Sequence, residues 1–217
     1  MSQQAKMQRV ASPGLFFRRW LAHPLQMGSI VPSSQALCRR VVQHAACGPD
    51  ELVLELGAGT GVISRALLDA GLPAHRLVLV EIVPALVDHL RQALPGVRVI
   101  QGDARDLPAL LAGIGTRIGA VICGVPLVLL PLHEQRRFVA SFVAVAPACG
   151  FLHYSYCLTS PLAPARLGLT ARRLAWTPFN IPPASVWHYR PASALGADSI
   201  LACPDGLWFD PDGRQWI

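Results

Sequence analysis

A turn with glycine at alternate positions, Gly57, Gly59 and Gly61, constrains the fold of this chain more than any other feature. An apolar run at 53–56 precedes the turn, and apolar residues at helical spacing follow it at 62–68. This order predicts a buried strand, a tight turn and a helix. Glycine has no Cβ, so the backbone can pass close to a ligand, and the start of the helix directs free N–H groups toward that ligand.

The spacing of the glycines excludes two other ligand-binding turns. A P-loop ends in Gly-Lys-Ser or Gly-Lys-Thr, and this turn contains no lysine. A dinucleotide fingerprint reads Gly-x-Gly-x-x-Gly, whereas each glycine here is two residues from the next. The turn therefore fits neither motif.

Two further apolar runs each lead into a carboxylate. Residues 77–80 lead into Glu81, about twenty residues after the glycines, where a carboxylate can accept hydrogen bonds from both hydroxyls of a ribose. Residues 97–100 form a third predicted strand and lead into Gly102, Asp103 and Ala104.

In this order, Glu55, the glycine turn, Glu81 and Asp103 resemble the cofactor-binding motifs of class I S-adenosylmethionine-dependent methyltransferases. The resemblance implies S-adenosyl-L-methionine as the cofactor, with Asp103 on the amino group of its adenine. The predicted cofactor-binding residues are Glu55, Gly57, Ala58, Gly59, Thr60, Gly61, Glu81, Ile82, Asp103, Ala104 and Cys123.

The alternation of strands and helices predicts an α/β fold. We expect a single Rossmann-like methyltransferase domain: a mostly parallel, seven-stranded sheet flanked by helices, with an N-terminal helical extension. The later strands are expected at 118–123, 149–156, 172–177 and 186–190, and a helix near 134–146. The domain is expected to span 50–190, after a basic extension at 1–49 and before a tail at 191–217 in which an Asp-Gly turn favours a small hairpin at 207–214.

The composition limits the environment of the protein. Hydrophobic residues make up 52% of the 217 residues, yet the longest apolar run, 120–132, is broken by glycine and proline and is too short to span a membrane. The six cysteines form no Cys-x-x-Cys pair, and no export signal is evident. We therefore expect reduced thiols in a cytoplasm, and no metal site.

The N-terminal extension carries the net charge. Residues 1–49 contain six basic residues and no acid, whereas the rest of the chain has 13 of each. A short helix at 15–21 would place aromatic residues opposite Arg18 and Arg19, which suits an anionic membrane surface; alternatively, the aromatics cap the core. We expect peripheral association with the inner face of the cytoplasmic membrane.

The end of the extension is predicted to begin a helix. Ser33 or Ser34 can cap a helix through residues 36–42. The loop from Gly28 to Ser34 is also expected to cover the cofactor and to shape the entrance for the methyl acceptor. Arg39 and Arg40 either attract phosphate headgroups or form a solvated helix face.

The segment after the fourth predicted strand bears on the methyl acceptor. Enzymes that methylate the amino group of adenine or the amide of glutamine carry an Asn/Asp-Pro-Pro-Tyr-like motif there. This chain reads Cys-Gly-Val-Pro-Leu at 123–127, which keeps Pro126 but lacks the polar and aromatic side chains. The sequence therefore disfavours methylation of a nucleic-acid base.

Other segments resemble bacterial phospholipid N-methyltransferases. They are 17–20, 23–25, 28–34, 124–127, 154–156 with 160–161, and 180–184 with 186–187. The resemblance implies methylation of phosphatidylethanolamine, through its monomethyl and dimethyl forms, toward phosphatidylcholine. The chain departs from the family at 153–158, where members tend to have Gln-Phe-Thr-Tyr-Gly-Pro, and members also act on ornithine lipids. No nucleic-acid partner is expected.

Tyr156 and Tyr154 are the predicted acceptor-binding catalytic residues, and His153 is a weaker candidate for the proton acceptor. The alternative for all three is packing at a strand end. The predicted substrate-binding residues are Gly28, Ser33, Ser34, Arg39, Pro126 and Leu127. Two other functions stay open: an rRNA or tRNA adenine N-methyltransferase, and a membrane-binding protein that keeps the fold without catalysis.

Overall fold

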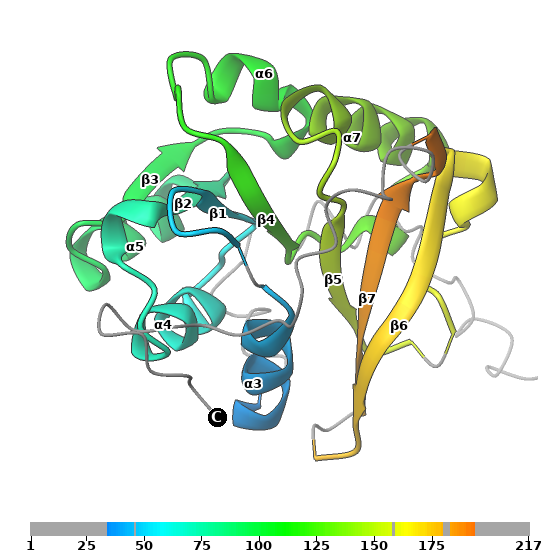
Figure 1. Cartoon of the computed structure of the whole chain (residues 1–217), viewed down its shortest axis with the longest axis horizontal. Coiled ribbons are helices and arrows are strands. Elements are labelled where there is room, and N and C mark those ends of the chain that lie inside the picture. The colour runs from blue at the N-terminus through cyan, green and yellow to red at the C-terminus, as the bar shows by residue number, and fades with distance from the viewer. Residues whose placement is uncertain (1–33, 46, 158, 180–182, 194–217) are drawn as a thin grey trace, which may run out of the picture.

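A computed structural model describes residues 34–45, 47–157, 159–179 and 183–193. Seven strands form one sheet in the order β3-β2-β1-β4-β5-β7-β6 (Figure 1). They are β1 (Leu52–Leu56), β2 (Leu77–Glu81), β3 (Arg98–Gln101), β4 (Ile118–Cys123), β5 (Phe151–Ser155), β6 (Leu169–Thr177) and β7 (Ala184–Pro191). The first five strands pair in parallel, and β7 runs antiparallel to β5 and β6. The predicted α/β fold with a mostly parallel seven-stranded sheet is confirmed.

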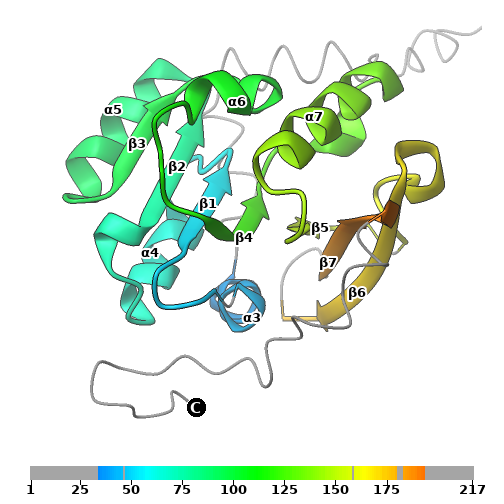
Figure 2. The ribbon, with the colours of Figure 1, turned by 45° about the horizontal axis from the view of Figure 1, so that its top comes forward.

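Helices cover both faces of the sheet (Figure 2). They are α3 (Gln35–His44), α4 (Val62–Asp69), α5 (Pro84–Ala93), α6 (Leu107–Leu110) and α7 (Leu132–Val145). Apolar residues of α3, α4 and α5 pack in one core cluster with β1, β2 and β5, while α6 and α7 pack in a second cluster on the opposite face. Because both faces are covered, β1 and β2 are continuous buried runs without polar alternation.

The helix predicted to begin at Ser33 or Ser34 is α3. Ser34 is its N-cap, and the Ser34 Oγ accepts a hydrogen bond from the Leu37 N–H at 3.2 Å. The buried residues Leu37 and Val41 lie on one side of α3, while Arg39 and Arg40 are exposed on the other. The capping role of Ser34 is thus confirmed.

Several predicted boundaries needed correction. β5 is shorter than the expected 149–156, because Cys149 and Gly150 form the turn before the strand, and Tyr156 follows its last pairing with β7. β6 and β7 are longer than expected, because they pair with each other along their whole length. The predicted helix at 15–21, the loop at 28–33 and the hairpin at 207–214 lie outside the described residues.

Within the described ranges, no helix is long and apolar enough to cross a membrane. The cysteines in this part of the chain, Cys38, Cys47, Cys123, Cys149 and Cys157, are all free thiols. The same residues include no cluster of His, Cys, Asp and Glu that could hold a metal ion.

Candidate active site

The glycine turn joins β1 to α4 with all three glycines in the left-handed region, at φ +71°, +58° and +77°. A Cβ on Gly57 would lie 2.9 Å from Val125 Cγ2, and one on Gly61 would lie 2.8 Å from Leu90 Cδ2. These two glycines therefore permit close packing against neighbouring elements. A Cβ on Gly59 would meet nothing within 4 Å, so the middle of the turn borders open space.

The carboxylate of Glu81 holds this turn in place. Glu81 Oε2 accepts a hydrogen bond from the Gly59 N–H at 2.9 Å, and Oε1 accepts from the N–H groups of Ile82 and Val83 at 2.9 and 3.0 Å. Its side chain is only 1% exposed. A carboxylate offers about four acceptor positions, so one remains beyond these three bonds. Binding of ribose hydroxyls by Glu81 stays a prediction, but the residue is well placed to orient the turn.

Glu55, near the end of β1, has a different environment. It is buried, and the Ser64 Oγ on α4 donates a hydrogen bond to its Oε2 at 2.6 Å. Burial raises the pKa of Glu55 to about 8, against a smaller lowering by Ser64, and the nearby charge of Glu81 raises it further. The carboxyl group is therefore mostly neutral at pH 7, and it ties α4 to β1. Its predicted role in cofactor binding remains a prediction.

A cleft of about 450 Å³, its open mouth included, lies beside the turn. Of the predicted cofactor-binding residues, the cleft is lined by Gly57, Glu81, Ile82, Asp103 and Ala104. Ala58, Thr60 and Gly61 belong to the turn itself, and Cys123 is fully buried at the end of β4. Burial raises the pKa of the Cys123 thiol to about 12, and the thiol donates to the Val125 carbonyl. Its contribution is therefore to the packing beneath the loop.

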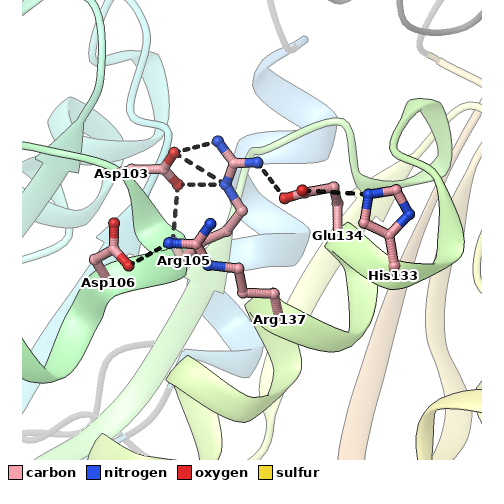
Figure 3. A network of polar contacts seen from close by, with 6 residues as sticks. All are labelled: Asp103, Arg105, Asp106, His133, Glu134 and Arg137. Atoms are coloured by element: carbon pink, nitrogen blue, oxygen red, sulfur yellow. Dashed lines mark hydrogen bonds and ion pairs between the residues drawn. The ribbon is translucent and has the colours of Figure 1, made fainter.

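An ion-pair network closes one wall of the cleft (Figure 3). Asp103 Oδ1 accepts from the Arg105 N–H and Nε, both at 2.9 Å, and the same guanidinium also pairs with Asp103 Oδ2 and with Glu134 in the first turn of α7. Burial alone would raise the pKa of Asp103, but the hydrogen bonds from Arg105 outweigh it and lower the pKa. The Asp103 carboxylate is thus held ionised, and its orientation is fixed by Arg105.

The loop after β4 passes directly over the glycine turn. A Cβ on Gly124 would lie 2.6 Å from the Gly57 carbonyl oxygen and 2.7 Å from the Tyr154 hydroxyl. Val125 lines the cleft, Pro126 is partly exposed, and Leu127 is fully buried beneath α7. Of the two predicted substrate-binding residues here, only Pro126 has a surface that an acceptor could reach without rearrangement of the loop.

The end of β5 presents the predicted catalytic residues. Tyr154 keeps part of its ring exposed, but its hydroxyl lies deep beside Gly124, and burial raises its pKa above the ordinary value, as does the charge of Glu55. Tyr156 is 37% exposed at the same edge. The Tyr154 hydroxyl therefore lies beside the β4 loop where that loop crosses the glycine turn, and Tyr156 is the more accessible phenol at the same end of β5.

His153 lies in the core. Its Nδ1 contacts the Cys123 carbonyl at 2.9 Å, and because a carbonyl only accepts, Nδ1 carries the proton. Burial lowers the pKa of His153 to about 4, against a smaller raising by this hydrogen bond. These features favour a structural histidine that joins β5 to β4.

The other predicted substrate-binding residues are less closely tied to the site. Arg39 is exposed on α3, whereas Gly28 and Ser33 lie outside the described residues.

The site fits a nucleoside cofactor. Glycines remove the side chains that would obstruct the turn, Glu81 and Asp103 offer carboxylate acceptors, and Val125 and Leu130 provide apolar walls. A sequence model of the methyltransferase domain matches residues 53–150, which include this whole cleft. The fold is similar to that of magnesium protoporphyrin IX methyltransferase from Synechocystis with bound S-adenosylmethionine, at a TM-score of 0.59 and 13% identity over 84% of this chain and 99% of that one.

The matched part of this chain is a methyltransferase domain.

S-adenosylmethionine, the predicted cofactor, is bound by the Synechocystis enzyme of the same fold.

Two curated relatives share part of this methyltransferase. The ornithine lipid N-methyltransferase of Singulisphaera acidiphila is 32% identical over 126 residues, which are 56% of this chain and 66% of that protein. The ribosomal RNA small subunit methyltransferase A of Chlorobium chlorochromatii is 30% identical over 78 residues, which are 36% of this chain and 28% of that protein. The chain thus spans just under two thirds of the first relative and little more than a quarter of the second.

Some residues of the methyltransferase cleft were not predicted. They are Val80, Gly102, Arg105, Val125, Leu130 and Phe138. Gly102 and Arg105 flank the predicted Asp103 and Ala104, so their proximity was a usable signal. Leu130 and Phe138 reach the cleft only because α7 folds back over the sheet, and nothing local in the sequence indicates this.

Proposed function

We propose that this methyltransferase transfers a methyl group to the amino group of a membrane lipid, with phosphatidylethanolamine and its monomethyl and dimethyl forms as the expected acceptors. The relative from Singulisphaera acidiphila is named for N-methylation of an ornithine lipid, which also carries a primary amine. The shared chemistry is methylation of an aliphatic amine on a lipid headgroup.

The observation that carries this proposal is the apolar loop after β4. Residues 123–127 supply neither an amide nor a carboxylate side chain, and no aromatic ring, to hold a planar base. Val125 faces the cleft and Leu127 is buried. An aliphatic amine needs no such planar grip, because it can be positioned by hydroxyl groups and by aromatic faces.

The residues of the site would then have separate roles in binding the cofactor and the amine. Bound S-adenosylmethionine supplies an electrophilic methyl group on a positively charged sulfur. The glycine turn, Glu81 and Asp103 hold the nucleoside, while Tyr156 and Tyr154 orient the amine at the adjoining edge of the sheet. Orientation and exclusion of water are sufficient sources of acceleration for a direct displacement.

The acceptor amine must be deprotonated before it attacks. An alkylammonium has a pKa of about 10, so proton transfer to a group with a pKa near 4, such as His153, is uphill by roughly 8 kcal/mol. We therefore assign release of the proton to bulk solvent at the exposed edge beside Tyr156, where deprotonation at pH 7 costs only about 4 kcal/mol, and we assign to His153 a positioning role for β5.

Expression in bacterial cells that lack methylated phospholipids tests this proposal. Thin-layer analysis of their lipids should show new monomethyl, dimethyl or trimethyl derivatives of phosphatidylethanolamine. The variant Gly59→Ala, expressed at the same level, is the matched control. Lipid profiles identical to that control, in cells with and without ornithine lipid, would refute lipid N-methylation.

A ribosomal RNA adenine is the second candidate acceptor, because several partial relatives are ribosomal RNA methyltransferases. Their matches cover only 26–36% of this chain, and a shared fold says little about the acceptor. Incubation of the protein with labelled cofactor and small-subunit rRNA tests this candidate directly, and no label above background is expected in the RNA.

A further inference from the structure

The hairpin formed by β6 and β7 reaches the same edge of the sheet as the active site. Ser155, the last residue of β5, pairs with Ser185 on β7, which in turn pairs with Trp176 on β6. Neighbouring strands lie about 5 Å apart, so the backbone of Trp176 is two strand spacings, roughly 10 Å, from the carboxyl end of β5. The segment after Trp176 therefore turns around beside the acceptor edge.

Large apolar side chains are exposed at this edge. In the described part of the chain they are Val128, Tyr156, Trp176 and Phe179, with exposed fractions of 44, 37, 49 and 82%. Val128 follows β4, Tyr156 follows β5, and the other two lie at the far end of β6. No other face of the described structure exposes a large hydrophobic side chain to this extent. Such gathering on one side marks an interaction surface.

The stretch of sequence that contains β5, β6 and β7 carries only positive charge. Residues 135–197 contain six arginines and no acidic residue, whereas residues 50–134 contain nine acidic residues and six basic ones. Arg172 and Arg173 are exposed on opposite faces of β6, since consecutive strand residues alternate. Arg173 lies over the Trp187 ring, 5.9 Å from its centroid, and neither arginine pairs with a carboxylate among the described residues. Residues 50–134, on the cofactor half, carry a net charge of −3, and residues 198–217 carry a further −3.

The spacing of aromatics and arginines matches a lipid–water boundary. Arg173 lies three residues before Trp176, which is about 10 Å along a strand. Trp and Tyr concentrate at membrane interfaces, and amphipathic surfaces enter a bilayer by about 5–10 Å. With Trp176 and Phe179 below the headgroups, the two arginines would lie at the level of the anionic phosphates.

We infer that the exposed carboxyl end of β6, with Trp176 and Phe179 at that end and Arg172 and Arg173 nearer the middle of the strand, is a docking surface for an anionic lipid bilayer. This inference rests on the proposed lipid acceptor and deepens it, because docking here brings the acceptor edge of the sheet to the membrane. It adds a second contact to the one predicted for the N-terminal extension.

Binding of the full-length protein to vesicles tests the surface. The probes are sucrose-loaded vesicles of phosphatidylcholine with phosphatidylethanolamine, with and without phosphatidylglycerol. The double variant Trp176→Ser with Phe179→Ser should lower the partition coefficient roughly 100-fold, because two large apolar side chains no longer enter the bilayer. Retention of the wild-type melting temperature shows that the variant is folded.

The arginines are tested by charge-matched variants. Arg172→Gln with Arg173→Gln should weaken binding to phosphatidylglycerol vesicles roughly tenfold and leave the weak binding to neutral vesicles unchanged. Arg65→Gln with Arg98→Gln removes the same charge from exposed positions on the cofactor half and should have no such effect. Equal losses from both pairs would mean that only net charge matters, and would overturn the inference.

Activity separates failure of the docking surface from failure of the proposed function. With short-chain phosphatidylethanolamine below its micellar concentration, the Trp176 and Phe179 variant should methylate at the wild-type rate, but with vesicles it should lose activity in step with binding. Wild-type vesicle binding by this variant overturns the docking surface and leaves lipid methylation standing. Loss of RNA binding in this variant, with no vesicle binding by the wild-type protein, would overturn it in favour of a nucleic-acid partner.

Discussion

The two halves of the sheet differ in how they are held together. The half formed by β1 to β4 is parallel, and its polar groups bond to each other. Glu81 accepts a hydrogen bond from the backbone of the turn, and Asp103 accepts from Arg105. In the half formed by β5 to β7, β5 pairs in parallel with β4, and the antiparallel strands β7 and β6 extend the sheet; this half exposes aromatic residues and arginines. The cofactor half is thus preorganised by internal bonds, whereas the acceptor half exposes side chains that can meet a partner.

The largest effect is expected from Gly59→Ala. The substitution places a methyl group in the open space of the turn and should weaken binding of S-adenosylmethionine roughly 100-fold, measured by calorimetry. Gly113→Ala is the matched control, because Gly113 also has a positive φ, +85°, and open space around it, but lies far from the turn in sequence and outside the cleft. Both variants should lose about 1–2 kcal/mol of stability from left-handed backbone strain. Equal cofactor affinities in the two variants would contradict the assignment of the turn.

A smaller effect is expected from Arg105→Gln. Loss of the charge-assisted bonds to Asp103 frees that carboxylate to rotate, so cofactor affinity should fall about tenfold. Arg137→Gln removes an exposed ion pair to Asp106 on the same wall and should change affinity little. Arg105 also reaches Glu134 on α7. Loss of Arg105 should raise the KM for the cofactor by a larger factor than it lowers kcat. A larger change in kcat than in KM would show that the network serves only to hold α7.

The acceptor half is tested by Tyr156→Ala. Removal of this accessible phenol should lower kcat/KM for the lipid acceptor roughly tenfold and leave cofactor affinity unchanged, because Tyr156 is not among the residues that line the cofactor cleft. Tyr156→Phe distinguishes the ring from the hydroxyl. An equal loss of cofactor affinity would break the separation of the two halves.

The effect of Glu55→Gln is expected on stability and not on activity. The pKa of Glu55 in the folded protein is about 8, above its ordinary 4.5, so this group stabilises the fold fully only below pH 4.5. As the pH rises toward 8, the unfolded chain releases the proton more readily, and the free energy of unfolding falls. Denaturant titrations at pH 5 and pH 8 should show a shallower decline in the variant, by about 1–3 kcal/mol. An unchanged decline would show that Glu55 is ionised in the folded protein.

Local patterns in the sequence were enough to predict the cofactor half. The strand Leu52–Leu56, the turn and the carboxylate at Glu81 are encoded within about thirty residues, and burial on both faces leaves an uninterrupted apolar run. The network from Asp103 to Glu134 was not predictable, because its partners are 31 residues apart and meet only when α7 packs on the sheet. The same holds for the deep position of the Tyr154 hydroxyl, which depends on Gly124 having no side chain.

The acceptor half was predicted less well. β6 and β7 alternate only weakly, since β6 is an edge strand whose arginines are exposed on both faces, and their ends are set by pairing with each other. Charge totals also concealed its character, because the +6 of residues 135–197 is cancelled in the sum for residues 50–217 by −3 from residues 50–134 and −3 from residues 198–217. The asymmetry appears when the charges of residues 50–134 and of residues 135–197 are counted separately.

Transfer of labelled methyl groups to vesicles containing phosphatidylethanolamine tests the central claim most directly. With purified protein and labelled S-adenosylmethionine, we expect the label in the lipid amine, dependent on Gly59 and on Tyr156, and none in small-subunit rRNA present in the same reaction. Label recovered in the rRNA and absent from the lipid would contradict this account.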